Sequence, residues 1–243
     1  MQDALIEKAP AAAPDGVAAV SRAFTILMAV ADETGSSTLA ELSRATGLHK
    51  STILRLLGTL ESGGFVSRLH DGSYLLGPSA FRLGLAYEQQ NPLQRQVIPV
   101  LRDLVEAGTE SASFHVRHGP NTRICLFRVN SRHSTVDRLE PGTILPLDRG
   151  APGKVLLAFD SKRPAEFEAI RAAGYAVSRG ERDPSCAAVA APVFGPDGRI
   201  AGAISLSGPG ERFSDEAVER MRRILIPTAA GLSDTLGGRS ARR

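Results

Sequence analysis

In the first third of the chain, the spacing of apolar residues is first that of helices and then that of a hairpin. A helix is predicted over residues 17–34, where apolar side chains recur every three to four positions: Val20, Phe24, Leu27 and Ala31. Thr38-Leu39-Ala40-Glu41 is a capping box, which predicts the start of a short second helix, and Gly47 suits its end. A third helix is expected over residues 49–64. It is followed by two short extended runs around an Asp71-Gly72 turn.

This order of helix, short helix, helix and hairpin is that of a winged helix-turn-helix, which we predict for residues 17–77. At about 100° per residue, the third helix places Ser51, Arg55 and Thr59 within roughly 80° of one another. Its apolar residues fall on the opposite side. Any surface helix has a polar face, but a helix that enters a major groove needs short donors at its N-terminus and a long donor for base edges. The candidate DNA contacts are Thr38, His49, Lys50, Ser51, Thr52, Arg55, Arg68 and His70.

The remaining chain predicts a linker helix over residues 78–91 and a second domain over residues 92–238. This domain begins with a helix over residues 92–107 that contains Pro99 and should be kinked there. Alternating apolar and polar residues then predict a hairpin over residues 111–129, in which Phe114 faces away from His115. Further helices are expected over 152–159 and 163–173, a strand near Tyr175, a second hairpin over 187–208, and a last helix capped by Ser214 with a break or kink at Pro227. The fold class is therefore α+β, with an antiparallel sheet in an α/β second domain.

Composition favours two domains of ordinary size in 243 residues and indicates the cytoplasm as the location. No apolar run is long enough for a membrane span, and the start has no signal-peptide pattern. Residues 1–16, rich in Ala and Pro, are expected to be a disordered tail, and residues 239–243 a basic tail. Cys125 and Cys186 lack the spacing of a disulfide framework or a zinc site, so we expect no metal and no cofactor.

The charge of the DNA-binding part is local. Residues 1–77 contain six Lys and Arg against eight Asp and Glu, a net charge of −2, although the whole chain has +3. Between residues 44 and 70, however, there are four Lys or Arg, two His and only one acid, Glu61. Phosphate attraction depends on this local field. Because the domain as a whole has no surplus positive charge to hold DNA indiscriminately, we expect a few groups at the front of the third helix, with Arg55 the main candidate, to read the base sequence.

Four stretches of the sequence match a known pattern: LAELSRATGLHKSTILRLLGTLESGGFV and SYLLGPSAFRLG in the first half, and LPLDRGAPGKVLLAF and AAVAAPVFGPDGRIAGAISLSGP in the second. With these stretches the sequence resembles the IclR family of bacterial transcriptional regulators, over about residues 17–238. The string G-L-x-K-S-T-x-x-R-L-L is specific, because a generic helix-turn-helix has no reason to contain Lys-Ser-Thr there.

The resemblance implies a regulator that binds near-palindromic operator DNA, dimerises with help from the linker helix, and binds a small organic acid in a GAF-like effector-binding domain. It implies a homodimer or a dimer of dimers, and either repression or activation. The effector pocket that it implies would include Ser134, Ala151, Pro152, the segment from Ser178 to Ala188, Ser205 and Ser207. Strand alternation puts both hydroxyls of Ser205 and Ser207 on one face, where they could hold one carboxylate together.

Signals for other chemistry are weak, and we expect no enzyme. Gly150 to Lys154 lacks the spacing and the Ser/Thr of a phosphate loop, and neither pocket serine lies beside an evident base. His115-x-x-His118 runs from a strand into a turn, which favours a solvated or anion-contacting role over a metal site. The seven cations between residues 117 and 154 either solvate strand edges or attract an anionic effector. An enzyme or hydrolase acting on a small carboxylate and an architectural DNA binder remain the alternatives.

Overall fold

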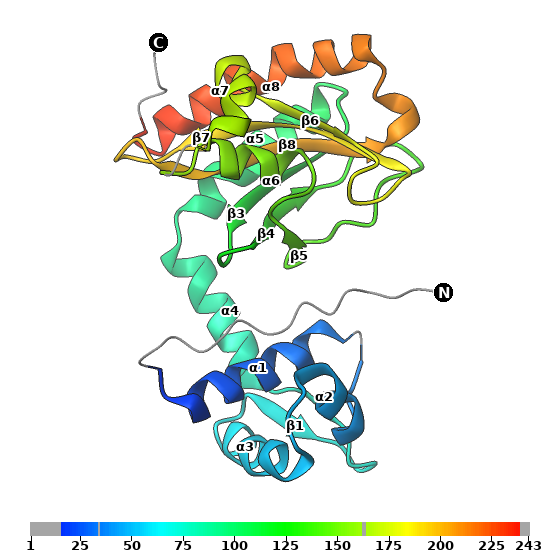
Figure 1. Cartoon of the computed structure of the whole chain (residues 1–243), viewed down its shortest axis with the longest axis vertical. Helices are drawn as coiled ribbons and strands as arrows, with labels where there is room; N and C mark the ends of the chain where they lie inside the picture. The colour runs from blue at the N-terminus through cyan, green and yellow to red at the C-terminus, as the bar shows by residue number, and fades with distance from the viewer. Residues whose placement is uncertain (1–15, 34, 162–163, 239–243) are drawn as a thin grey trace. The chain divides into compact units, whose positions relative to one another are not determined.

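The computed structural model describes residues 16–33, 35–161 and 164–238, and its contacts divide the chain into two units between Asn91 and Pro92 (Figure 1). Each unit is described by itself. The tails predicted for residues 1–16 and 239–243 lie outside the described residues, apart from Gly16. None of the helices within these ranges is both long and apolar enough to cross a membrane.

Unit 1 has the predicted order of a winged helix-turn-helix. Its elements are α1 (Ala18–Asp32), α2 (Leu39–Thr46), α3 (Lys50–Ser62), β1 (Val66–Arg68), β2 (Tyr74–Leu76) and α4 (Pro78–Gln90). The strands β1 and β2 pair in antiparallel fashion. One apolar cluster holds α1, α2, α3 and the hairpin together: Ile26, Val30, Leu42, Ile53, Leu56, Leu57, Val66 and Tyr74. Burying these side chains fixes which side of α3 faces solvent.

The turn between α2 and α3 is set by local signals in the sequence. Thr38 forms the predicted capping box: its amide donates to Glu41 Oε2 over 2.7 Å, and Glu41 N donates to Thr38 Oγ1 over 3.3 Å. These bonds from Thr38 lower the pKa of the Glu41 carboxyl. Gly47 ends α2 with φ +69°, a left-handed conformation that glycine adopts without strain. The start of α3 is thereby directed away from α2.

Unit 2 is a six-stranded antiparallel sheet with helices on both faces, which agrees with the predicted fold class. The strand order is β5-β4-β3-β8-β7-β6. The elements are α5 (Leu93–Glu106), β3 (Ser111–Arg117), β4 (Thr122–Val129), β5 (Ile144–Pro146), α6 (Ala151–Ala158), η1 (Ala165–Phe167), α7 (Glu168–Ala173), β6 (Ala176–Arg179), β7 (Cys186–Phe194), β8 (Ile200–Pro209), η2 (Gly210–Arg212) and α8 (Asp215–Thr235).

Three details of unit 2 differ from the sequence-based expectation. The short edge strand β5 was not expected, because three residues are too few to show a period. The helix expected over 163–173 is a 3-10 turn followed by the short α7. Pro227 does not break α8, which continues to Thr235, because a proline removes only one backbone bond and both sides of the helix pack on the sheet.

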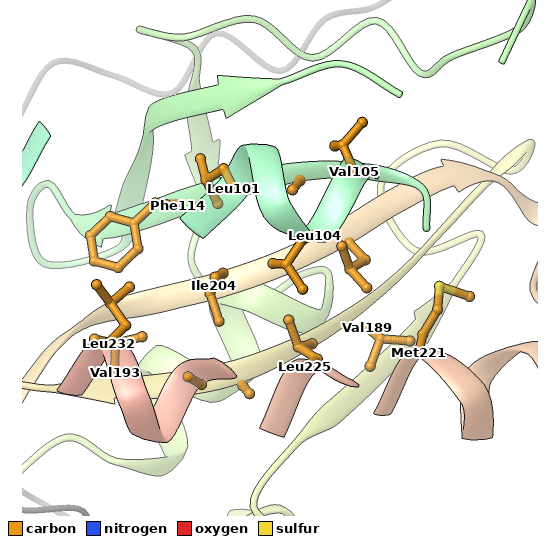
Figure 2. Packing of buried hydrophobic residues seen from close by; sticks show 14 of the residues in the cluster. Leu101, Leu104, Val105, Phe114, Val189, Val193, Ile204, Met221, Leu225 and Leu232 are labelled. Atoms are coloured by element: carbon orange, nitrogen blue, oxygen red, sulfur yellow. The ribbon is translucent and has the colours of Figure 1, made fainter. Parts of the chain in front are cut away.

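One face of the sheet is closed by α5 and α8 over an apolar core. Figure 2 shows Leu101 and Leu104 of α5 and Leu225 of α8 directed toward Phe114 and Ile204 of the sheet. The ring of Phe114 packs over Gly202, where an added Cβ would lie 2.3 Å from its Cζ. This face stabilises the unit through the burial of large apolar side chains.

The opposite face is covered by α6, with a smaller apolar cluster. Val155 and Leu156 of α6 pack on Ala176, Ala190 and Ala203 of the sheet. These small sheet residues let the helix approach closely at one end. Toward the β3–β4 side the same face is lined by polar and charged side chains instead, which leads to the candidate site.

Candidate functional site

A bulge in β4 gathers polar side chains on the α6 face of the sheet. Phe114 pairs with Phe127, whereas the next residue, His115, pairs with Cys125, so that one extra residue is inserted in β4. The bulge puts Arg128 on the same face as Arg123, although an odd spacing would otherwise separate them. A pocket that is partly open to solvent lies on this face. Its lining includes His115, Arg123, Asp137, Pro152, Ser178, Glu181, Arg182, Ala188, Ser205 and Ser207.

Asp137 is the centre of a buried ion-pair cluster at the pocket. Its Oδ1 accepts a bond from Arg128 Nη2 over 2.5 Å, and both side chains are at most 2% exposed. The other oxygen, Oδ2, accepts from Ser207 Oγ over 3.1 Å and lies 3.4 Å from Arg182 Nη2. Arg128 Nη1 also donates to Ser207 Oγ over 3.3 Å. Two guanidinium groups therefore share one carboxylate, and the Ser207 hydroxyl is already bonded.

The N-terminus of α6 is capped by a residue of β6 and by a residue of the loop that follows β6. Glu181 Oε2 accepts from Gly150 N over 2.9 Å, and Glu181 Oε1 pairs with Lys154 Nζ. Ser178 Oγ accepts from Ala151 N over 2.9 Å. A carboxylate at a helix N-terminus is stabilised by the helix dipole and by the unsatisfied amides. The chain thus supplies its own anion to this helix end.

Three buried polar atoms of the pocket have no partner among the described residues: His115 Nδ1, Arg123 Nε and Ser205 Oγ. His115 bonds only through Nε2, which lies 3.0 Å from Ser113 Oγ. Burial, with the charges of Arg123, Arg128 and Arg182, lowers the pKa of His115 well below its usual value, so the ring is neutral at pH 7. Buried polar atoms without partners are rare in folded proteins, so their convergence on one cavity indicates a ligand site.

Arg123 reaches the pocket because two glycines leave room for its guanidinium. An added Cβ at Gly153 would lie 2.9 Å from Arg123 Nη1, and one at Gly150 would lie 3.2 Å from Nη2. Nη1 donates to Arg149 O over 2.8 Å and also to Pro146 O. Burial, and then the charge of Arg182, lowers the pKa of Arg123 to about 10, so it remains a cation at neutral pH. The residue is only 2% exposed.

The structure brings together most residues of the implied effector pocket. Pro152, Ser178, Ala188, Ser205 and Ser207 line it, and Ala151 lies buried beside it at the start of α6. Ser134 is exposed and is not among the lining residues. Ser205 and Ser207 share one strand face as predicted, but only the Ser205 hydroxyl is unpartnered.

Of the two alternatives for the charged hairpin residues, a solvated role or contact with an anion, the solvated role is wrong for His115, Arg123 and Arg128. His115 is 1% exposed and lines the pocket, whereas His118 is exposed on the turn, so His115 is not solvated. Arg123 and Arg128 are buried rather than solvated at strand edges.

Glu181 and Arg182 lie in the segment from Ser178 to Ala188 that the resemblance implies, and Asp137 ends the loop that begins at His133. The sequence did not single out these three charged residues, because they lie in loops without regular spacing. Within the described ranges, no group of three or more His, Cys, Asp or Glu could hold a metal ion.

In unit 1, α3 presents the predicted polar face to solvent. Lys50, Ser51 and Arg55 are exposed, and Thr52 is half-buried at the edge of this face. Ile53, Leu56 and Leu57 point into the core, as the angle count predicts. No side-chain partner is found for Lys50, Ser51 or Arg55 within the described part of the chain. These donors are therefore available to a partner outside this chain.

The other candidate DNA contacts differ in how available they are. Thr38 is exposed, but its hydroxyl is engaged in the capping box with Glu41. His49 is the N-cap residue of α3, and its side chain makes no capping bond. Arg68 and His70 are exposed in the hairpin, with the Arg68 guanidinium 5.8 Å from the centre of the Tyr74 ring. The hairpin thus presents two basic groups beside α3.

Both units match known protein families. The IclR helix-turn-helix domain model matches residues 19–70, and the model of the bacterial transcriptional regulator IclR C-terminal domain matches residues 164–234. The HTH-type transcriptional regulator BhcR of Paracoccus denitrificans is 32% identical over 245 residues, covering 90% of this chain and 87% of the relative. The transcriptional repressor IclR of Escherichia coli is 27% identical over 257 residues, covering 95% and 94%.

Solved structures show the same architecture. The crystal structure of an IclR transcriptional regulator from Alicyclobacillus acidocaldarius matches with a TM-score of 0.79 at 26% identity, covering 91% of this chain and 99% of the other. The match extends over both units rather than over the helix-turn-helix alone. With both domain models matched and a relative 32% identical over nearly its whole length, this chain belongs to the IclR family of bacterial transcriptional regulators.

Proposed function

We propose that this regulator binds operator DNA through α3 and that a small organic acid, bound in the pocket of unit 2, changes its affinity for that DNA. The observation that carries the DNA-binding part is the exposed, unpartnered donor set Lys50, Ser51 and Arg55 on a helix whose other side is buried. DNA binding would require the protein to act in the cytoplasm. The sequence predicts the same location.

The donors on α3 differ in their position along the helix. Lys50 and Ser51 lie at its N-terminus, where their ammonium and hydroxyl donors and the helix dipole favour phosphate oxygens. Arg55 lies one turn further along and is long enough to reach the edge of a guanine in the major groove. Arg68 and His70 of the hairpin would contact the flanking backbone. Thr38 would act indirectly, by fixing the start of α2.

The test is a selection of DNA from a random pool, followed by measurement of affinity for the enriched site and for unrelated DNA. Arg55→Ala should cost about 1–3 kcal/mol on the enriched site and little on unrelated DNA. Arg22→Ala, which removes an exposed arginine from α1, is the matched control and should change neither. An equal loss on both DNAs would show that Arg55 reads no base.

The acid-binding part is supported by the cationic, partly unpartnered character of the pocket. Three arginines line or flank it, and Ser205 and His115 offer unpartnered neutral atoms. A thermal-shift screen of small carboxylates should raise the melting temperature of the wild-type protein, because a ligand that binds only the folded state stabilises it. Ser205→Ala should weaken this shift while leaving DNA binding intact.

We further propose that the pocket senses its ligand without converting it. The curated relatives that cover nearly the whole chain are transcriptional regulators. Incubation of the protein with a carboxylate that it binds, followed by NMR of the small molecule, should recover the compound unchanged. Turnover in this assay would favour the alternative of an enzyme or hydrolase.

Dimerisation through unit 1 is supported by apolar side chains that this chain leaves exposed. On α1, Val20, Phe24 and Met28 follow one helix face and are 50%, 63% and 44% exposed. On α4, Phe81 is 71% and Leu85 is 41% exposed. Exposed apolar stripes of this kind mark interaction surfaces, and a second copy of the chain would bury them. Light scattering should give a dimer or a dimer of dimers, and Phe24→Glu with Phe81→Glu should reduce the mass.

The ligand would act by binding one arrangement of the dimer better than another. Operator affinity can change only by the ligand's differential affinity for the two arrangements. Because α4 connects the helix-turn-helix to the pocket unit, it is the element through which we expect the change to pass. Whether release or binding of DNA follows depends on which arrangement the ligand prefers.

A further inference from the structure

The charged groups around the pocket do not balance. Arg128 and Arg182 share the single carboxylate of Asp137, so this group of three retains one positive charge. Lys154 and Glu181 neutralise each other. Arg123 has no carboxylate within ion-pair distance among the described residues. Two positive charges are therefore left in the pocket wall.

Two other acids near the pocket are not within ion-pair distance of Arg123 or Arg182. Asp183 lines the pocket at a half-buried position, where its Oδ1 accepts bonds from Ser185 N over 2.9 Å and from Ser185 Oγ over 2.7 Å. Asp148 is exposed to solvent, and water screens its charge. Neither acid therefore pairs with the arginines of the pocket wall.

The burial of Arg123 is costly unless something binds to it. A guanidinium in the protein interior loses its hydration, and bonds to carbonyls offset only part of this desolvation cost when no anionic partner is present. The Nη1 atom of Arg123 is bonded to backbone carbonyls, but Nε is a buried donor with no acceptor. Charge-assisted bonds to a ligand carboxylate would offset the desolvation cost of burying Arg123.

Arg182 is placed to bind a second carboxylate. Its Nη2 lies 3.4 Å from Asp137, whereas Arg128 is held to the same carboxylate at 2.5 Å, and the Arg182 side chain is 29% exposed. Arg182 is thus the weakly held cation at the open side, and Arg123 is the buried one. Arg123, Arg182 and His115 all line the same pocket.

We propose that the ligand is a short dicarboxylate, with one carboxylate on Arg123 and the other on Arg182. This inference rests on the proposed function, in which the pocket is the effector site. A monocarboxylate would leave one of the two positive charges unpaired. Ser205 Oγ and His115 Nδ1, both unpartnered, lie in the same lining and would bond the ligand between its two ends.

The test compares ligands that differ by one charge. Isothermal titration of the full chain at constant ionic strength should show succinate binding at least about tenfold more tightly than its monoamide, succinamate, which has the same shape. Butyrate, in which a methyl group replaces one carboxylate, should also be weaker. Malonate against propionate repeats the comparison at a shorter length. Equal or tighter binding of the monoanions would overturn the inference.

Two variants assign the ends of the ligand. Arg123→Gln should abolish binding of both succinate and succinamate. Arg182→Gln should reduce succinate binding to about the level of succinamate and leave succinamate binding nearly unchanged. Arg199→Gln, at an arginine whose side chain is 84% exposed, is the matched control. Thermal melts check that the variants fold, and the comparison of ligands on the wild-type protein stands without them.

The outcomes separate this inference from the proposed function. If monocarboxylates bind as well as dicarboxylates and Arg182→Gln has no effect, the pocket is an effector site but the dicarboxylate class is wrong. If no carboxylate of either class binds the wild-type protein, the proposed acid-sensing function fails together with it.

Discussion

The two faces of the sheet in unit 2 are built from the same strands but differ in chemistry. On the α5 and α8 face, Phe114, Ile204 and Leu225 are 0% exposed and pack only on apolar neighbours. On the α6 face, the next residues along those strands, His115 and Ser205, are as deeply buried but have polar atoms without partners. The polar atoms of His115 and Ser205 thus distinguish the second face, because the described residues provide no partner for them.

The difference shows that burial alone does not identify a core residue. Arg123 and Arg128 come from one strand and one face, yet Arg128 is paired with Asp137 and Arg123 has no carboxylate partner in the described structure. Removing one partner of a buried ion pair is costly, because the other charge is left buried and uncompensated. Removing a buried charge that has no partner leaves no such charge behind. Substitutions of Arg128 and Arg123 that look alike are therefore expected to differ in cost.

The largest effect is expected on the apolar face. Phe114→Ala should lower the free energy of unfolding of unit 2 by about 3–5 kcal/mol, because it removes a fully buried ring and leaves a cavity above Gly202. Urea denaturation monitored by circular dichroism measures the change. A loss below about 1 kcal/mol would mean that this face is not the stabilising core.

A sharper test compares the two buried arginines. Arg128→Met should cost about 3 kcal/mol in the ligand-free protein, because it leaves Asp137 buried with only its weaker partners. Arg123→Met should cost clearly less, within about 1 kcal/mol, since removal of an unpaired buried charge offsets the lost bonds to carbonyls. Parallel urea titrations measure the free energy of unfolding of both variants. A similar loss in the two variants would contradict the distinction between the paired and the unpaired arginine.

A glycine pair contrasts a crowded backbone position on α6 with an open position on α8. An added Cβ at Gly153 of α6 would lie 2.2 Å from Leu147 O, so Gly153→Ala should cost about 1–3 kcal/mol and displace the Arg123 guanidinium. Gly231 of α8 has nothing within 4 Å of such a Cβ, and Gly231→Ala should stabilise by about 0.5–1 kcal/mol. Thermal melts of both variants provide the measurement, and a gain from Gly153→Ala would contradict the close contact.

The smallest effect is a pH dependence of stability from His115. Its pKa is lowered in the folded state by burial and by the neighbouring arginines, whereas the unfolded chain keeps the ordinary value near 6.5. The unfolded chain therefore binds a proton that the folded protein does not, and stability falls as the pH drops from about 6.5 toward the folded pKa. Denaturation between pH 7.5 and 5.5 should show this loss. His115→Gln should flatten it, and His118→Gln, at an exposed position, should not.

Local patterns predicted most of the fold, because the spacing of apolar residues along the chain distinguishes helices from hairpins. The capping box at Thr38, the inward Ile53 and Leu57, and the opposed Phe114 and His115 are all visible in the sequence. The bulge in β4 is not, because it depends on pairing with β3, and it decides that Arg128 joins Arg123 on the pocket face. The loop residues Asp137 and Arg182 are brought together by the fold over 45 positions of sequence. No local period could show that contact.

The most direct test of the central claim measures affinity for the enriched DNA site by fluorescence anisotropy, with and without a saturating carboxylate that the protein binds. The wild-type protein should change its affinity when the ligand is present, and Arg123→Gln should bind the DNA equally well with or without it. If the ligand binds the wild-type protein but its affinity for the site stays the same, the pocket does not control DNA binding, and the proposed function is wrong.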